Sequence, residues 1–342
     1  MSVTRRAVPP LLFLLFLHLL VVLAGFVAPY DATSQFRELP FAPPSRVHLF
    51  DRSGGLHLRP FIYPWKNNGG FADYQEDTDH AARVAFFVSG DSYPILFGFR
   101  SSLHLFGVDQ PARIVLLGTD GYGRDQFSRF LFGGQISLFA GLLAAGLSIG
   151  LGLLLGSAAG YRGGLLDAML MRTTEVLIAL PWLYLLLALR GFLPLHMNPA
   201  PTFLVLIAVI GALGWGRPAR LVRGMVLSAK ERNYVAAARG FGASEFYLLR
   251  RHVLPQTRGV ILTQAAILIP QYILAEVTLS FLGLGVAEPV ASWGNLLSAL
   301  QQYSVLTSYW WMILPGFLLV PVFLGYYVLA RSFEVQVESS PY

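Results

Sequence analysis

The chain has 342 residues, of which 55% are hydrophobic and only 13% are charged. Soluble domains carry about 25% charged residues, so this composition, with its long apolar runs, predicts a multi-pass membrane protein and argues against a soluble domain. The sequence contains no cysteine, which excludes disulfides, thiolate metal sites and cysteine catalysis. The net charge is +6, and its placement along the chain says more than its sum.

Six apolar runs are each long enough to cross a bilayer as a helix. They cover approximately residues 9–28, 134–160, 166–189, 201–216, 259–284 and 309–330. The first run follows Arg5 and Arg6, but it is too long for the core of a signal peptide and lacks a small-residue cleavage site. The sequence therefore predicts an all-α membrane domain of six helices, the first of which is an anchor.

Lysine and arginine are unevenly distributed between the segments that connect these runs. Nine of them lie within 217–258, against two acidic residues, whereas 29–133 carries ten basic and eleven acidic residues. Because basic loops stay in the cytoplasm, we expect 217–258 and both termini on the cytoplasmic side and 29–133 outside.

The long outside segment alternates short apolar stretches with turn sequences such as Ser53-Gly54-Gly55. The stretches are Val47–Phe50, Leu56–Tyr63 and Ala85–Val88. This pattern is typical of strands and hairpins and predicts an extracytoplasmic β-rich insertion. The expected organisation is an anchor at 1–30, the insertion at 31–117, a five-helix domain at 118–330 and a cytoplasmic tail at 331–342.

Residues 117–125 read Leu-Gly-Thr-Asp-Gly-Tyr-Gly-Arg-Asp, directly before the second apolar run. The glycines permit tight turns, and the charged residues can form an ion pair and cap the start of a helix. A catalytic use of the two aspartates as acid and base is disfavoured, because no nucleophile accompanies them. The candidate residues are Gly118, Thr119, Asp120, Gly123, Arg124 and Asp125.

Residues 234–255 lie inside the basic segment and read YVAAARGFGASEFYLLRRHVLP. The alanines and glycines predict a short helix over 234–245 with a smooth surface that another protein can approach closely. On its pattern alone, such a segment is usually a solvated surface helix, and only its placement and the further motifs below favour a contact surface. The candidate contact residues are Tyr234, Ala237, Ala238, Gly242, Ala243, Leu254 and Pro255.

Two further features lie within the apolar runs. Glu276 and Glu175 lie in or near spans, where burial of a carboxylate is costly, so both are candidate pathway or packing residues. Glycines spaced four apart on the second run allow close helix packing, within the chain or at a subunit interface. They form two sets, Gly146 with Gly150, and Gly152 with Gly156 and Gly160.

Together, these motifs resemble the C-type permease subunit of bacterial dipeptide and oligopeptide (peptide/nickel) ABC importers. The stretch 117–125 resembles the signature before that family's second helix, and 234–255 resembles its cytoplasmic loop that docks on an ATPase subunit. Ala236 stands where that loop usually has glutamate. Residues 274–285 and 292–295 resemble the fifth span and the loop after it. The resemblance covers approximately 115–325.

The resemblance implies a multi-pass protein of the bacterial inner membrane with the type I importer permease fold. It implies as partners a second homologous permease, two cytoplasmic ATPase subunits and an extracytoplasmic solute-binding protein, with peptides as cargo and nickel or another small solute as the alternative. The chain lacks a Gly-x-x-x-x-Gly-Lys-Ser/Thr phosphate-binding loop, so ATP hydrolysis is expected in a partner. We expect no cofactor, metal or nucleic acid. An intramembrane enzyme and a standalone channel are less favoured, since the first needs a nucleophile or metal triad and the second leaves 234–255 unexplained.

Overall fold

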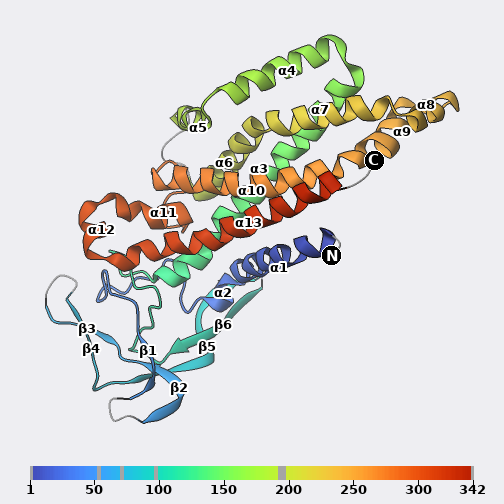
Figure 1. Ribbon diagram of the computed structural model, residues 1–342. Coiled ribbons are helices and arrows are strands. Elements are labelled where there is room, and N and C mark those ends of the chain that lie inside the picture. The colour runs from blue at the N-terminus through green and yellow to red at the C-terminus, as the bar shows by residue number, and fades with distance from the viewer. Residues whose placement is uncertain (1–2, 52–54, 70–72, 96–98, 192–197, 340–342) are drawn as a thin grey trace. The chain divides into compact units, whose positions relative to one another are not determined.

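A computed structural model describes residues 3–339 of the chain, apart from 52–54, 70–72, 96–98 and 192–197. The described residues are mostly helical, with an antiparallel β-sheet region in the N-terminal third (Figure 1). They form two compact units. The helical unit comprises 1–15, 138–279 and 321–342, and the sheet unit comprises 16–137 and 280–320.

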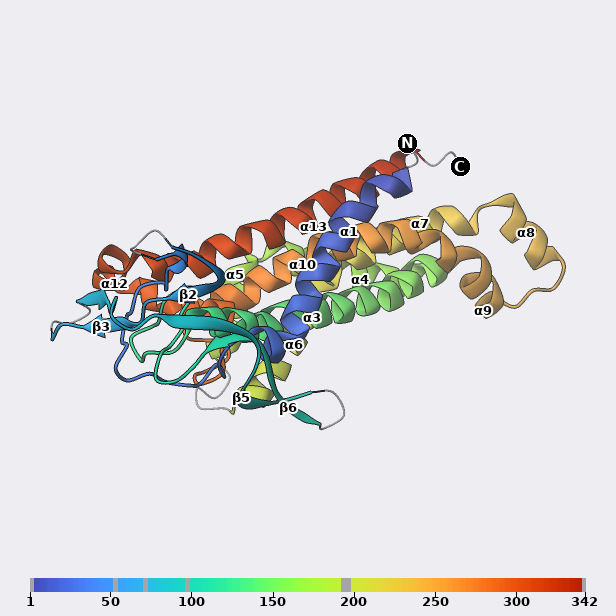
Figure 2. The same ribbon diagram turned by 90° about the horizontal axis from the view of Figure 1, so that it is seen from below.

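The sheet unit contains a four-stranded antiparallel sheet of order β1-β2-β5-β6 and a two-stranded sheet of β3 and β4. Its strands are β1 (Val47–Phe50), β2 (Leu56–Ile62), β3 (Trp65–Asn67), β4 (Tyr74–Glu76), β5 (Ala82–Pro94) and β6 (Arg100–Val108). Strands β5 and β6 form its longest hairpin (Figures 1 and 2), and Val84 of β5 packs with buried Ile62 and Ile114. The three predicted strand stretches are therefore confirmed, whereas the limits 31–117 stay a prediction.

The helices range from long apolar elements to short connecting ones. The longest are α3 (Gln126–Arg162), α10 (Arg258–Phe281) and α13 (Leu314–Ser339). The others are α1 (Val3–Val22), α2 (Ala24–Val27), α4 (Gly164–Ala179), α5 (Trp182–Gly191), α6 (Pro199–Gly214), α7 (Gly216–Lys230), α8 (Asn233–Gly240), α9 (Glu245–Leu248), α11 (Trp293–Ser298) and α12 (Tyr303–Ser308). A π turn and a 3-10 turn carry α9 through Leu249–Thr257 into α10.

Among the described residues, three helices are long and apolar enough to cross a membrane, and five if each of two bent pairs counts as one span. The sequence predicted six. The first predicted run falls short, because its apolar helix covers only Ala7–Val22 before the chain leaves helical geometry at Leu23.

Two prolines explain why the third and fourth predicted spans are bent. Helices α4 and α5 meet at 93°, since Pro181 forces the preceding Leu180 into extended geometry. Helices α6 and α7 meet at 42° near Trp215, where Pro218 cannot donate a backbone hydrogen bond to the carbonyl of Gly214. The predicted third span is thus two helices, and the fourth continues to Lys230.

One glycine set of α3 forms a close contact with α7 in the helical unit. A Cβ added at Gly152, Gly156 or Gly160 would meet Pro218, Ala219 or Val226 of α7. A Cβ at Gly146 or Gly150 would meet no described atom within 4 Å. The set Gly152, Gly156 and Gly160 therefore serves packing within the chain. Helix α7 is in turn joined to α4 by an ion pair, in which Nε of Arg223 lies 2.5 Å from Oδ1 of Asp167.

We predict that Gly156→Ala lowers the stability of the purified chain by about 1–3 kcal/mol, because the new methyl group collides with the Ala219 carbonyl and the two helix backbones must separate. Thermal unfolding in detergent measures the effect. Gly150→Ala on the same helix is the matched control and should be neutral or stabilising by up to about 1 kcal/mol. Equal losses for both variants would contradict this packing.

Candidate functional site

The six residues singled out in 117–125 come together in the interior of the sheet unit. Asp120 accepts hydrogen bonds from the backbone N–H of Tyr122 (2.9 Å) and Arg124 (3.0 Å), and its other oxygen pairs with Nε of Arg124 (2.8 Å). Gly118 and Gly123 both have φ of +73°, the left-handed region that glycine enters without strain. Thr119 accepts a bond from the Ala42 N–H (2.7 Å). The predicted ion pair is therefore present.

Asp125 caps the first turn of α3. Its Oδ2 accepts hydrogen bonds from the backbone N–H (2.8 Å) and the hydroxyl (2.6 Å) of Ser128. Burial raises the pKa of the Asp125 carboxyl to about 6, and the bonds from Ser128 oppose that rise. The carboxylate therefore holds a structural position at the helix start.

Glu288 completes this cluster, and sequence reasoning missed it. Its carboxylate pairs with Nη1 of Arg124 (2.6 Å) and Nη2 of Arg129 (2.9 Å). The side chain of Arg129 is only 1% exposed, whereas that of Glu288 is 46% exposed. Glu288 thus pairs with two buried guanidinium groups that lie 159 and 164 positions away in the sequence, a separation that no local pattern reveals.

The loop that carries Glu288 is fixed by the motif at 292–295. The Ser292 hydroxyl accepts from the Asn295 N–H and the Asn295 side chain accepts from the Ser292 N–H, which forms a capping box at α11. Trp293 is buried and donates its indole N–H to the carbonyl of Phe130 (2.9 Å). Asp120 and Arg124 of the first motif, Arg129 of α3 and Glu288 of this loop form one cluster, which we call the arginine cluster (Asp120, Arg124, Arg129, Glu288).

The segment 234–255 lies in the helical unit and differs from its prediction. A continuous helix over 234–245 is wrong, because α8 ends at Gly240 and α9 begins at Glu245. Gly242 has φ of +83°, its N–H bonds the Arg239 carbonyl, and the next N–H bonds the Ala238 carbonyl. These two bonds form a Schellman motif, which ends a helix at a left-handed glycine. Gly242 is therefore a turn residue.

The exposed surface of this segment carries aromatic side chains as well as small ones. Phe241 is 92% exposed and Phe246 71% exposed, and Tyr234 and Tyr247 are also exposed. Ala237 is exposed, whereas Ala238, Ala243, Leu254 and Pro255 are half-buried. Sequence reasoning noted the alanines and missed the aromatic residues. The sequence signal that could have found these aromatic residues is their position among charged residues in a basic segment.

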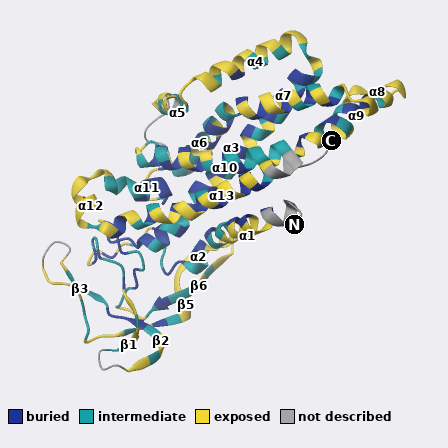
Figure 3. Ribbon diagram, in the orientation of Figure 1, coloured by how far each residue is buried: buried dark blue, intermediate teal, exposed yellow. Residues whose placement is uncertain are grey.

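The opposite face of the segment anchors it to the helical unit. Val235, Leu248 and Val253 are buried, and Val253 packs with Val222 and Val226 of α7. Glu245 pairs with Nε of Arg239 (3.2 Å) and accepts a hydrogen bond from the Tyr161 hydroxyl at the end of α3. Helices α8 and α9 thus project at the end of α7 with a mostly exposed surface (Figures 2 and 3). Below, this projecting segment (233–257) is called the coupling segment.

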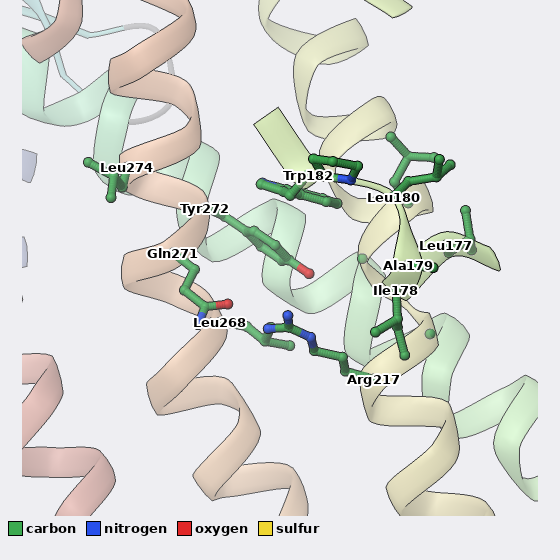
Figure 4. A pocket seen from close by; sticks show the side chains of 14 residues that line it. Leu177, Ile178, Ala179, Leu180, Trp182, Arg217, Leu268, Gln271, Tyr272 and Leu274 are labelled. Carbon is green, nitrogen blue, oxygen red and sulfur yellow. The ribbon is translucent and has the colours of Figure 1, made fainter. Parts of the chain in front are cut away.

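A cavity of about 500 Å³ lies where the two bent helix pairs face α10 (Figure 4). Its wall is mostly apolar and includes Leu177, Ile178, Pro181, Trp182 and Leu268. Arg217, Gln271 and Tyr272 supply its polar side chains. The sequence prediction counted Arg217 among the residues of the basic loop, whereas the structure places it on α7, opposite the middle of α10.

The two carboxylates singled out within the spans occupy different environments. Glu276 is fully buried on α10. Glu175 is exposed on α4 and pairs with Arg172, with 2.8 Å between Oε2 and Nη1. Neither lines the cavity beside Arg217. Among the described residues, no three His, Cys, Asp or Glu side chains are grouped as a metal site would require.

Residues 152–338 match the model of the binding-protein-dependent transport system inner membrane component. The chain belongs to this family. The match takes in the coupling segment and the cavity, whereas 117–125 precedes it. This inner membrane component therefore carries both features within the part that defines the family.

Several relatives of this inner membrane component are identified as peptide permeases. The dipeptide transport system permease protein DppC of Bacillus subtilis is 38% identical over 218 residues, which are 64% of this chain and 66% of that protein. The oligopeptide transport system permease protein OppC of the same organism is 38% identical over 226 residues (65% and 72%). OppC of Haemophilus influenzae is 39% identical over 203 residues (59% and 63%). The chain thus spans about two thirds of the length of these relatives.

We predict that Glu288→Gln lowers the stability of this inner membrane component by roughly 1–3 kcal/mol, because the buried Arg129 guanidinium loses its closest anionic partner. Thermal unfolding in detergent measures it. The matched control is Glu175→Gln, which breaks an ion pair whose two side chains are exposed and should cost less than about 1 kcal/mol. A loss no larger than that of the control would show that Glu288 does not stabilise the arginine cluster.

Proposed function

We propose that this chain is the transmembrane permease subunit of an ATP-driven importer of di- and oligopeptides. It forms half of the translocation pathway and performs no chemistry itself. Membership of the family supports a role in binding-protein-dependent transport. The relatives named as dipeptide and oligopeptide permeases support peptides as the cargo.

The observation that carries this proposal is the two-faced coupling segment. Exposed apolar side chains gathered on one surface mark a protein interface, and here Phe241, Phe246 and Tyr247 occur among arginines. The opposite face packs on α7 through Val253, and the chain runs on into α10. A partner that pushes on the exposed face would therefore move α7 and α10 together, as coupling to ATP hydrolysis requires.

The finer assignments follow from the same proposal. The partners are a second homologous permease, two cytoplasmic ATPase subunits and an extracytoplasmic solute-binding protein. Six spans cross the membrane in the type I arrangement, with α1 as the first despite its short apolar stretch. The coupling segment and both termini are cytoplasmic and 31–117 is outside, as the distribution of basic residues favours.

We predict that Ala237→Trp abolishes co-purification of the ATPase subunits, with a drop of about tenfold or more. Ala237 is exposed on α8, where a bulky side chain fits the free chain but blocks the approach of a partner. The measurement is the ratio of ATPase to permease after affinity purification of the tagged permease.

Two controls separate steric blocking from misfolding. Ala81→Trp places the same bulk at an exposed position next to β5 and should leave the ratio unchanged. Gly242→Ala strains the left-handed turn with little added bulk, and its Cβ meets no described atom within 4 Å, so it should lower the ratio far less than Ala237→Trp. Unchanged ATPase association in Ala237→Trp would refute the docking role.

The cargo is tested by uptake into proteoliposomes that hold the complete complex with its binding protein. We expect ATP-dependent uptake of labelled tripeptides, and no uptake when the ATPase subunits lack their phosphate-binding lysine. Peptide uptake that survives that change would contradict energy coupling. Uptake of nickel without peptides would contradict the cargo and leave the coupling intact.

A further inference from the structure

The cavity of the helical unit lies where a membrane helix bundle is least regular. Its wall takes in the break between α4 and α5 at Leu180 and Pro181, and the bend between α6 and α7 at Gly214 and Gly216. Discontinuous helices are tolerated in a membrane where they line a pathway or a binding site. At about 500 Å³, the cavity is within the range of small-ligand sites, roughly 300–1,000 Å³.

Arg217 brings a permanent positive charge to this cavity. No carboxylate of the described residues lies within ion-pairing distance of it, although other arginines of the chain, such as Arg223 and Arg124, have such partners. Arg217 is exposed on the cavity wall opposite the middle of α10, so water or an anion in the cavity can reach its charge. The side chain is therefore available to an anionic ligand that enters the cavity.

Of the three polar side chains in the cavity, Tyr272 is engaged by a residue of the chain, whereas Arg217 and Gln271 can bind a ligand. Tyr272 is buried, its hydroxyl shares a hydrogen bond of 3.0 Å with Ser148, and its ring stacks on Trp182 at a centroid distance of 5.8 Å. Among the described residues, Gln271 makes no hydrogen bond through its amide. Figure 4 shows the Gln271 amide and the Arg217 guanidinium extending toward one another from opposite walls.

We propose that Arg217, assisted by Gln271, binds a carboxylate of the peptide as it passes through this cavity. The planar guanidinium presents paired N–H donors that match the two oxygens of a carboxylate, and the Gln271 amide adds another donor. The apolar wall accepts side chains without demanding a particular sequence. This inference rests on the proposed function, because it takes a peptide as the cargo.

The test uses the complete complex in proteoliposomes and compares Arg217→Gln with wild type for three peptides. These are trialanine, trialanine amide, and Ala-Glu-Ala amide, whose only carboxylate is on a side chain. Each result is the variant-to-wild-type ratio of initial uptake rates, so the preference of the binding protein cancels. We expect the ratio to fall about tenfold for trialanine and to change less than about twofold for trialanine amide.

Ala-Glu-Ala amide distinguishes the two sources of the carboxylate. A ratio as low as that of trialanine shows that a side-chain carboxylate is also bound, and a ratio like that of trialanine amide assigns the site to the C-terminus. Arg220→Gln removes the same charge from α7 outside the cavity and should leave all three ratios near one.

Charge rescue provides a second measurement that does not depend on transport of amides. The chain has no cysteine, so Arg217→Cys can be modified selectively against a wild-type complex treated in parallel. An ethylammonium methanethiosulfonate should restore trialanine uptake and the ethylsulfonate reagent should not. Equal ratios for trialanine and its amide, or equal effects of the two reagents, would overturn the carboxylate site. A wild-type complex that transports no peptide would instead overturn the proposed function.

Discussion

Two missing backbone N–H groups determine much of the helical unit. Pro181 and Pro218 cannot continue the hydrogen-bond ladder, so two apolar runs that a hydropathy pattern treats as single spans become bent pairs. The bend at Trp215 places Arg217 on a cavity wall, and the segment after it packs directly on Gly152 and Gly156 of α3. The glycines allow this approach, and the prolines decide which residues face α10.

The coupling segment has one face that is packed on the helical unit and another face that is exposed. Its buried Val253 packs on α7, while its phenylalanines remain exposed. Gly242 makes this division possible, because the turn that it forms separates α8 from α9 and so presents two short helices instead of one long one. The segment is thus joined to α7 by direct packing and to α10 through the backbone.

The arginine cluster plays a structural role in the sheet unit. Two guanidinium groups buried beside each other would repel, and Asp120 with Glu288 supplies two negative charges that oppose this repulsion. The cluster joins the turn before α3 to the loop between α10 and α11. The motif at 117–125 and Glu288, which are far apart in sequence, are thus two parts of one arrangement.

The sequence by itself determined the membrane class, the strands of the N-terminal region, the family resemblance and the local pairing of Asp120 with Arg124. These depend on composition, periodicity and contacts within a few residues. Only the tertiary structure decided that Glu288 completes the arginine cluster, that α8 stops at Gly240, and that Arg217 faces a cavity instead of belonging to a loop. The physical reason is that these outcomes depend on backbone geometry at single prolines and glycines and on contacts between distant segments, which hydropathy and charge patterns do not encode.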